Sequence, residues 1–330
     1  MALINFFANP DSYTPGYYTT ILDAAAAIAS PFLVQQKYQT FPGVNVSGTQ
    51  VAYNGTLFNV STNYINPSPD YYIQAPDAFL NVWPKPRIDY FPNAAYDPTT
   101  NTFNAFIDCV GYGSRVLIAT GSDDPAQNAL RLFESQVNPD AAHFSAPGWV
   151  PMAFEFAVAL PVLRPGRWSY VCGSVYVPGI QKQESDKVYN GAAKGGFSGA
   201  QAGDIVCMAY EQAESNGHFM VLTQAPQPVS LSLFQNLDSR VANAYRISVY
   251  DSTASGSSLH FNDSRRTDND TDSGVGYGEL YFFTNSSDEP IGFIFGPVAG
   301  GMEPPHYLYD PNVAQTSKLE VMAITLGRFQ

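Results

Sequence analysis

The sequence predicts an α+β protein, because two helical patterns precede a long series of apolar segments of strand length. The helical patterns cover about Asp108 to Thr120 and about Pro125 to Gln136. The strand-like segments that follow are WSYVCGSVYV, GDIVCMAY, HFMVLTQ, YRISVYD, GELYFFT and IGFIFGP, and the last segment, KLEVMAITLG, fits either a strand or a short helix. Helices first and antiparallel-looking strands after them are typical of the α+β class.

The chain divides at about residue 100. Residues 1–100 are rich in Tyr, Pro and Asn and contain no Cys or His. One helix is predicted near Tyr17–Tyr38, and an Asn-Gly turn at Asn54–Gly55 within alternating residues predicts a β-hairpin. We expect residues 1–100 to be an N-terminal extension or small β-rich subdomain that packs on the core and forms one wall of a cleft near Cys109. Residues 101–330 then form the domain that carries the chemistry.

The charge of the chain excludes two classes of partner. There are 29 Asp and Glu against 16 Lys and Arg, which gives a net charge of −13. Nucleic-acid binding needs a basic surface, and an anionic membrane repels such a chain. No apolar run approaches the roughly 20 residues of a membrane span, and the first residues contain no recognisable signal peptide.

Cys109 is the candidate nucleophile. It lies in FIDCVGYGSRVL, where the helical pattern begins, and Asp108 or Asn104 can cap that helix. A helix N-terminus favours the thiolate, which is the reactive form of cysteine. Gly113, one turn further on, lets another chain segment approach. The alternative is that Cys109 is a small buried residue of an ordinary helix.

The other two cysteines, Cys172 and Cys207, lie within apolar strands, and we expect them to be structural. Three cysteines are too few for a disulfide scaffold, and their spacing is not that of zinc ligands.

A base and a group that orients it can be found among the strands. His218 begins the strand HFMVL, which pairs as a hairpin with GDIVCMAY, and alternation puts it on the face of Met220 and Leu222. If that face packs on the Cys109 helix, the imidazole meets the thiol. Asp251 ends the apolar face of YRISVYD and needs a polar partner. We expect that partner to be His218, through its Nδ1–H.

Three blocks of sequence carry a family resemblance. DCVGYGSRVL, GDIVCMAYEQAESNGHFMVL and YRISVYDST resemble the cysteine, histidine and third-residue motifs of NlpC/P60-type papain-like cysteine peptidases. Val110 departs from the usual serine, Asp251 replaces a His or Asn, and the gap between Cys109 and Gly203 is long. The resemblance implies a papain-like fold in which the helix that carries Cys109 packs on an antiparallel β-sheet.

The resemblance also implies a function. It implies a thiol protease or amidase, with Cys109, His218 and Asp251 as catalytic residues and no cofactor. The substrate would be a cell-wall peptidoglycan stem peptide or a related short peptide, and the protein would be secreted or extracytoplasmic. Tyr96 would help to bind the oxyanion, and an arginine would bind a substrate carboxylate. The candidates for that arginine are Arg164, Arg167, Arg265 and Arg266. The alternative is a non-catalytic structural or interaction protein, secreted or virion-associated, on the same scaffold.

Two weaker patterns lie in HFNDSRRTDNDTDSGVGYGE. Asp268, Asp270, Asp272 and Glu279 have the spacing of calcium ligands in an EF-hand loop, although Ser273 stands where the glycine is needed, so an exposed acidic turn is the favoured interpretation. His260, Asp263 and Arg265 could line the cleft, or Asp263 and Arg265 could form a surface ion pair. The run GVGYG precedes a strand, which is the wrong context for a dinucleotide site.

Overall fold

The structure is a computed structural model, and it describes the parts of the chain in which the predicted helices near 17–38 and 108–120 and most candidate strands lie. These parts are residues 18–36, 44–47, 50–53, 56–63, 96–97, 100, 102–106, 108–120, 153, 156–157, 160, 168–175, 195–210, 217–254, 259–266, 273–310 and 321–329. The predicted helix at 125–136 and the Pro-rich segment expected to form a cleft wall lie outside the described residues. No helix in the described part is long and apolar enough to cross a membrane.

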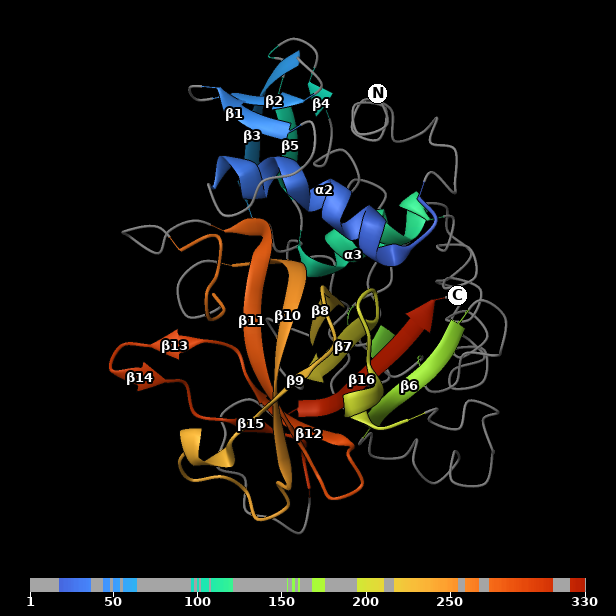
Figure 1. Ribbon diagram of the computed structural model, residues 1–330, viewed down its shortest axis with the longest axis vertical. Coiled ribbons are helices and arrows are strands. Elements are labelled where there is room, and N and C mark those ends of the chain that lie inside the picture. Colours follow the sequence, from blue (N-terminus) through green and yellow to red (C-terminus); the bar gives the residue numbers. More distant parts are fainter. Residues whose placement is uncertain are drawn as a thin grey trace, which may run out of the picture.

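A small five-stranded sheet holds the N-terminal residues (Figure 1). Its strands, in the order β1-β2-β3-β5-β4, are β1 (Val44–Ser47), β2 (Gln50–Tyr53), β3 (Thr56–Asn63), β5 (Thr102–Phe106) and β4 (Tyr96–Asp97). The predicted hairpin is confirmed, since Tyr53 of β2 pairs with Thr56 of β3 across the Asn-Gly turn. Strand β5 lies beyond residue 100 and pairs in parallel with β3, so this sheet extends past the expected division of the chain.

A nine-stranded sheet forms the rest of the described fold, and it curves into a half-barrel. Its main path runs β15-β12-β11-β10-β8-β7-β16-β6, and β9 pairs with β10 beside it. The strands are β6 (Trp168–Val175), β7 (Ile205–Tyr210), β8 (Gly217–Leu222), β9 (Gln227–Val229), β10 (Asn243–Thr253), β11 (Gly274–Thr284), β12 (Pro290–Ile294), β15 (His306–Tyr307) and β16 (Val321–Phe329). A separate two-stranded ribbon, β13 (Pro297–Val298) and β14 (Gly301–Met302), extends to one side (Figure 1). All pairings within the large sheet are antiparallel, and the C-terminal segment is a strand.

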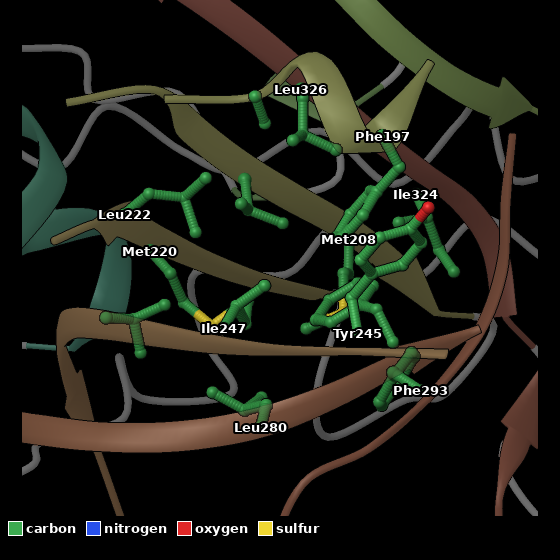
Figure 2. Packing of buried hydrophobic residues seen from close by; sticks show 14 of the residues in the cluster. Phe197, Met208, Met220, Leu222, Tyr245, Ile247, Leu280, Phe293, Ile324 and Leu326 are labelled. Atoms are coloured by element: carbon green, nitrogen blue, oxygen red, sulfur yellow. The ribbon is translucent and has the colours of Figure 1, made fainter. Parts of the chain in front are cut away.

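The prediction of an α+β, papain-like fold is wrong, because the described chain is mostly antiparallel β-sheet. The physical reason lies in the main hydrophobic core. Its members come from strands of the large sheet, together with Phe197 and Ala200 at the short 3-10 turn η7 (Phe197–Gly199), and none comes from an α-helix. Figure 2 shows these side chains meeting inside the curved sheet. The sheet therefore buries its apolar face mainly against itself.

Strand alternation decides which side chains enter this core. In β8, Met220 and Leu222 point inward, and in β10 Tyr245 and Ile247 do the same (Figure 2). Val249 of β10 belongs to the same core. Phe219 of β8, which is also fully buried, lies on the other face and contacts Phe156 edge-on at 5.2 Å between ring centroids. The sheet is thus covered on both faces.

Helices α2 (Ile21–Gln35) and α3 (Cys109–Ala119) lie on the outer face. Asp108 caps α3, because its Oδ1 accepts the backbone N–H of Gly111 at 2.6 Å. Helix α3 packs against β8 and β10, and α2 packs against α3 and β11 (Figure 1). The Tyr112 hydroxyl donates to the carbonyl of Ala25 at 2.9 Å and joins the two helices.

The N-terminal residues contact the large sheet at the start of β11. The backbone N–H of Val275 donates to Thr62 Oγ1 at 2.8 Å, and Gln36 Nε2 donates to the Val275 carbonyl at 3.3 Å. These bonds join segments more than 200 residues apart in the sequence.

The Gly-Asp pair before β7 has a structural role. Gly203 has φ +87°, which favours glycine, and the buried Asp204 carboxylate accepts two hydrogen bonds of 2.8 Å from the Arg328 guanidinium. Asp204 Oδ2 also accepts the backbone N–H of Gln201 at 2.7 Å. The Gly-Asp pair therefore connects the start of β7 to β16, the strand that carries Arg328.

Gly113→Ala tests the packing of α3 on β8. A Cβ at this position would lie within 2.8 Å of three ring atoms of the fully buried Phe219. Overpacking costs about 1–3 kcal/mol, and the helix propensity gained by replacing glycine, about 1 kcal/mol, offsets only part of this. We expect a net loss of unfolding free energy in urea titrations. Gly199→Ala is the control, because nothing lies within 4 Å of its Cβ. Equal stability of the two variants would contradict this packing.

Candidate active site

Asp251 is the centre of a buried polar cluster at one end of the half-barrel core. It follows Tyr245, Ile247 and Val249 on the inward face of β10, and its exposed fraction is 0%. A buried carboxylate requires hydrogen-bond donors or a positive charge beside it. Asp251 has both.

Three side chains donate to the Asp251 carboxylate. His218 Nε2 and His260 Nε2 each lie 2.7 Å from Oδ2, and Arg265 Nη1 lies 2.9 Å from Oδ1. An ionised carboxylate only accepts hydrogen bonds, so both histidines carry their hydrogen on Nε2. The pairing of His218 with Asp251 was predicted from strand alternation, but the prediction that Nδ1 makes the bond is wrong.

Burial keeps His218 neutral, and the groups that donate to Asp251 keep that carboxylate ionised. Burial is the largest effect on His218 and lowers its pKa, although the Asp251 carboxylate opposes this. Burial alone would raise the pKa of Asp251, but Arg265, His260 and the hydrogen bonds from both histidines together hold this pKa well below its usual range. The result at neutral pH is an imidazole with a hydrogen on Nε2 and a lone pair on Nδ1. This is the state required of a general base.

Arg265 is an internal residue. Its exposed fraction is 0%, and its Nε and Nη2 donate to the two oxygens of Asp263 at 2.7 and 2.8 Å. Asp263 is also buried, so the expectation of a surface ion pair is wrong. The guanidinium binds Asp251 and Asp263 inside the protein, where a substrate carboxylate in a cleft does not reach it. Asp263 also accepts the backbone N–H of His260 at 2.8 Å and so shapes the turn that carries both donors.

The GVGYG run makes room for the two donors. Gly276 pairs with Asp251 across β10 and β11, and Gly278 pairs with Val249. A Cβ at Gly276 would lie 2.8 Å from two atoms of Arg265, and one at Gly278 would lie within 2.8 Å of three atoms of His260. These glycines are the sequence signal for the roles of His260 and Arg265, which the analysis of single strands missed.

Cys109 is the first residue of α3 and is 3% exposed. It lies near β7, because an electrostatic interaction with Cys109 is the second cause, after burial, of the raised pKa of both Cys207 and Tyr210. No hydrogen bond joins Cys109 to His218 among the described residues. Cys172 and Cys207 are buried in β6 and β7, and none of the three cysteines, all of which lie in the described part of the chain, forms a disulfide. Burial raises the pKa of Cys172 and Cys207, so neither thiol ionises readily.

The expectation that the His218 face of β8 packs on the Cys109 helix is wrong. Helix α3 packs through Gly113 on Phe219, whereas His218 lies on the opposite, inward face with Met220. However, His218 lies near the start of β8, where it is the second residue. Its partner on β7 is Met208, and the inward face of β7 carries both Met208 and Tyr210. Cys109 thus neighbours residues of both faces at the end of the β7–β8 pair.

Phe295 forms an apolar wall beside the two histidines. Its ring lies parallel to His260 at 5.8 Å between centroids and edge-on to His218 at 5.7 Å. His306, which hydrogen-bonds to Glu303 at 2.9 Å, contacts the same ring at 6.3 Å. Phe295 is partly exposed, so the wall extends from the core to the surface.

The other predicted ligand residues are placed as follows. Tyr96 lies in β4, and its backbone pairs with Phe103 in the small sheet. Glu279 lies in β11, and its carboxylate accepts from Asn262 Nδ2 at 2.7 Å and from the Tyr277 hydroxyl at 3.2 Å. The three aspartates of the proposed calcium loop, Asp268, Asp270 and Asp272, lie outside the described residues.

Within the described part of the chain, His218, Asp251 and His260 form a group that could hold a metal ion, since one ligand atom of each lies within 4.8 Å of the others. Two features of the cluster disfavour a cation. The Arg265 guanidinium already neutralises Asp251 from Oδ1. Both Nε2 atoms are also engaged with Oδ2 at hydrogen-bond distance. The donor set is therefore better suited to orienting an imidazole than to ligating a metal.

Comparisons with protein-family models, with curated protein sequences and with solved structures found no match.

Arg265→Met tests the electrostatic centre of the cluster. The variant leaves two buried carboxylates, Asp251 and Asp263, without their cation, and breaking a buried pair in this way costs about 3–5 kcal/mol. Arg240→Met is the control, because Arg240 also binds two carboxylates, Asp238 and Asp310, but its side chain is 25% exposed. Such an exposed pair contributes up to about 1 kcal/mol. Urea unfolding of both variants measures the difference, and equal losses would contradict the buried charge network.

His218 also makes the stability depend on pH. Its pKa in the folded protein lies below the ordinary value of 6.5, so the unfolded chain binds more protons as the pH falls below that value. Stability is therefore complete above about pH 6.5 and decreases as the pH is lowered toward 5. His218→Gln retains an amide donor for Asp251 but does not titrate. We expect melting temperatures between pH 7 and 5 to fall less in this variant than in the parent. Identical slopes would contradict the assignment.

Proposed function

We propose that the protein is a cysteine hydrolase that cleaves amide bonds, with Cys109 as nucleophile, His218 as base and Asp251 as the group that orients the base. The observation that carries the proposal is the His218–Asp251 hydrogen bond of 2.7 Å inside a buried cluster. It fixes one tautomer of a neutral histidine, and the lone pair on Nδ1 is then available to a thiol.

The position of Cys109 supports its role as nucleophile. It begins a helix that Asp108 caps, and the dipole at a helix N-terminus favours a thiolate. It neighbours Tyr210, whose side chain shares the inward face of the β7–β8 pair with His218. Catalytic hydrogen bonds often form only when substrate binds, and the proposal requires the Cys109 thiol to come within reach of His218 in the substrate complex.

The reaction would proceed in two steps. His218 Nδ1 takes the thiol proton while the Cys109 sulfur attacks the amide carbonyl, and the helix N-terminus with the Cys109 backbone N–H stabilises the oxyanion. The C–N bond then breaks, and His218 gives its proton to the departing amine, which leaves a thioester. Water attacks the thioester, its proton passes to His218 and then to the sulfur, and the acid product and free thiol result.

The substrate class follows from the motif resemblance. We propose a short peptide that contains D-residues, such as a peptidoglycan stem peptide, and an extracytoplasmic site of action. The substrate carboxylate would need a cation other than Arg265, which is buried in the ion pairs described above. Arg266 donates to the backbone carbonyls of His260 and Leu259 at 3.1 Å, and Arg164 and Arg167 lie outside the described residues. The alternative is a structural or interaction protein without turnover.

Turnover and alkylation test the proposal together. Cys109 should react with iodoacetamide well below pH 8.5, the ordinary pKa of a thiol. Cys172 and Cys207 should stay unmodified in the folded protein and serve as internal controls. Cys109→Ser and His218→Ala should abolish release of products from muropeptides, measured by mass spectrometry. Asp251→Asn should cost several orders of magnitude in rate, roughly 10⁴-fold in a comparable triad.

The matched control for the histidine is His306→Ala, because His306 contacts Phe295 but hydrogen-bonds to Glu303 instead of Asp251. An alkylation midpoint near pH 8.5 that His218→Ala does not change would contradict an activated thiol. Absence of turnover in the parent with such a midpoint would favour the non-catalytic alternative.

A further inference from the structure

His260 has a place in the cluster that the proposed catalytic steps do not use. Its Nε2 donates to the same oxygen, Asp251 Oδ2, that accepts from His218, and both distances are 2.7 Å. The two rings are 5.9 Å apart between centroids and are inclined by 72°. One carboxylate oxygen thus connects two imidazoles.

The surroundings of His260 exclude direct contact with a substrate. Its exposed fraction is 0%, whereas that of His218 is 6%. Its ring is held between Phe295, which is nearly parallel to it, and the backbone of β11 at Gly278. Its Nδ1 is buried and has no hydrogen-bond partner among the described residues. A proton on this Nδ1 would have no acceptor, so the one polar contact of the ring is the bond to Asp251.

Three donors leave the carboxylate little freedom to rotate. Arg265 holds Oδ1 from one side, and His260 holds Oδ2 from another. The remaining acceptor direction of Oδ2 faces His218 Nε2. A carboxylate fixed in this way accepts from Nε2 of His218 in one orientation of the imidazole, which leaves Nδ1 as the proton acceptor.

We propose that His260 is a positioning residue that, together with Arg265, fixes the Asp251 carboxylate and so selects the Nε2–H tautomer of His218. The inference rests on the proposed function for its consequence in catalysis. The tautomer itself is a property of the resting protein and can be measured without a substrate.

Nuclear magnetic resonance of the protein labelled with ¹⁵N-histidine provides the test, because the two ring nitrogens of each tautomer have distinct shifts. The parent should show His218 at pH 7.5 with its hydrogen on Nε2. His260→Phe keeps a ring against Phe295 but removes the donor, and His260→Gln keeps an N–H donor but removes the ring. We expect a mixture of His218 tautomers in His260→Phe and the parental signal in His260→Gln.

Turnover should follow the same order. A hydrogen bond to a charged acceptor corresponds to a loss of about tenfold to hundredfold in kcat for His260→Phe, with KM unchanged because the residue does not touch substrate. His260→Gln should recover most of this loss. His306→Gln is the control for removing a histidine that contacts Phe295 without contacting Asp251, and it should leave the His218 signal and kcat as in the parent.

Three results would overturn the proposal. They are a parental His218 with its hydrogen on Nδ1, a His260→Phe variant with the parental tautomer, and a His260→Gln variant as impaired as His260→Phe. If His260→Phe does not fold, the spectra of the parent and of His260→Gln still test the proposal, because His218 should carry its hydrogen on Nε2 in both proteins. Failure of the proposed function looks different, because the tautomer would respond to His260 while Cys109→Ser left turnover unaffected.

Discussion

The site depends on one buried negative charge, the carboxylate of Asp251. Its burial would be prohibitive without compensation, and the fold supplies one guanidinium and two imidazole donors around it. The donors come from β8 and from the turn that carries His260 and Arg265, so the charge on β10 also joins these two elements to that strand. Because the carboxylate remains ionised, it accepts from His218 Nε2 and orients the imidazole, while burial lowers the pKa of His218 and keeps the ring neutral.

The half-barrel explains how such a charge can be held. Its apolar side chains turn inward and contact each other. The polar residues of the cluster around Asp251 therefore lie near the strand ends, where the inward apolar faces stop. Asp251 lies at such an end of β10, and His218 lies at the start of β8. The glycines of β11 open space there for the turn that carries His260 and Arg265. Packing therefore decides where the polar cluster can form.

Local sequence patterns predicted most of the helices and strands but not the curvature of the large sheet into a half-barrel. Apolar segments of strand length identified β6, β7, β8, β10, β11 and β12, and alternation suggested the pairing of His218 with Asp251, since both properties depend on neighbouring residues along one strand. The ambiguous segment at β16 and the wrong fold class depend on how the sheet curves, which residue periodicity does not encode. Likewise the prediction of which face of β8 meets α3 was wrong, because Gly113 packs against Phe219 and not against His218. The donors His260 and Arg265 lie on an irregular turn, and only GVGYG signalled the space they fill.

The central claim is that Asp251 holds His218 as a base for Cys109, and an experimental structure of the protein with Cys109 modified by a peptide electrophile tests it most directly. The account predicts a covalent bond at Cys109 with the sulfur within hydrogen-bond reach of His218 Nδ1, roughly 3–4 Å, and with His218 Nε2 still bound to Asp251. A modified sulfur on the Phe219 side of β8, separated by the sheet from an inward-facing Nδ1, would contradict the account.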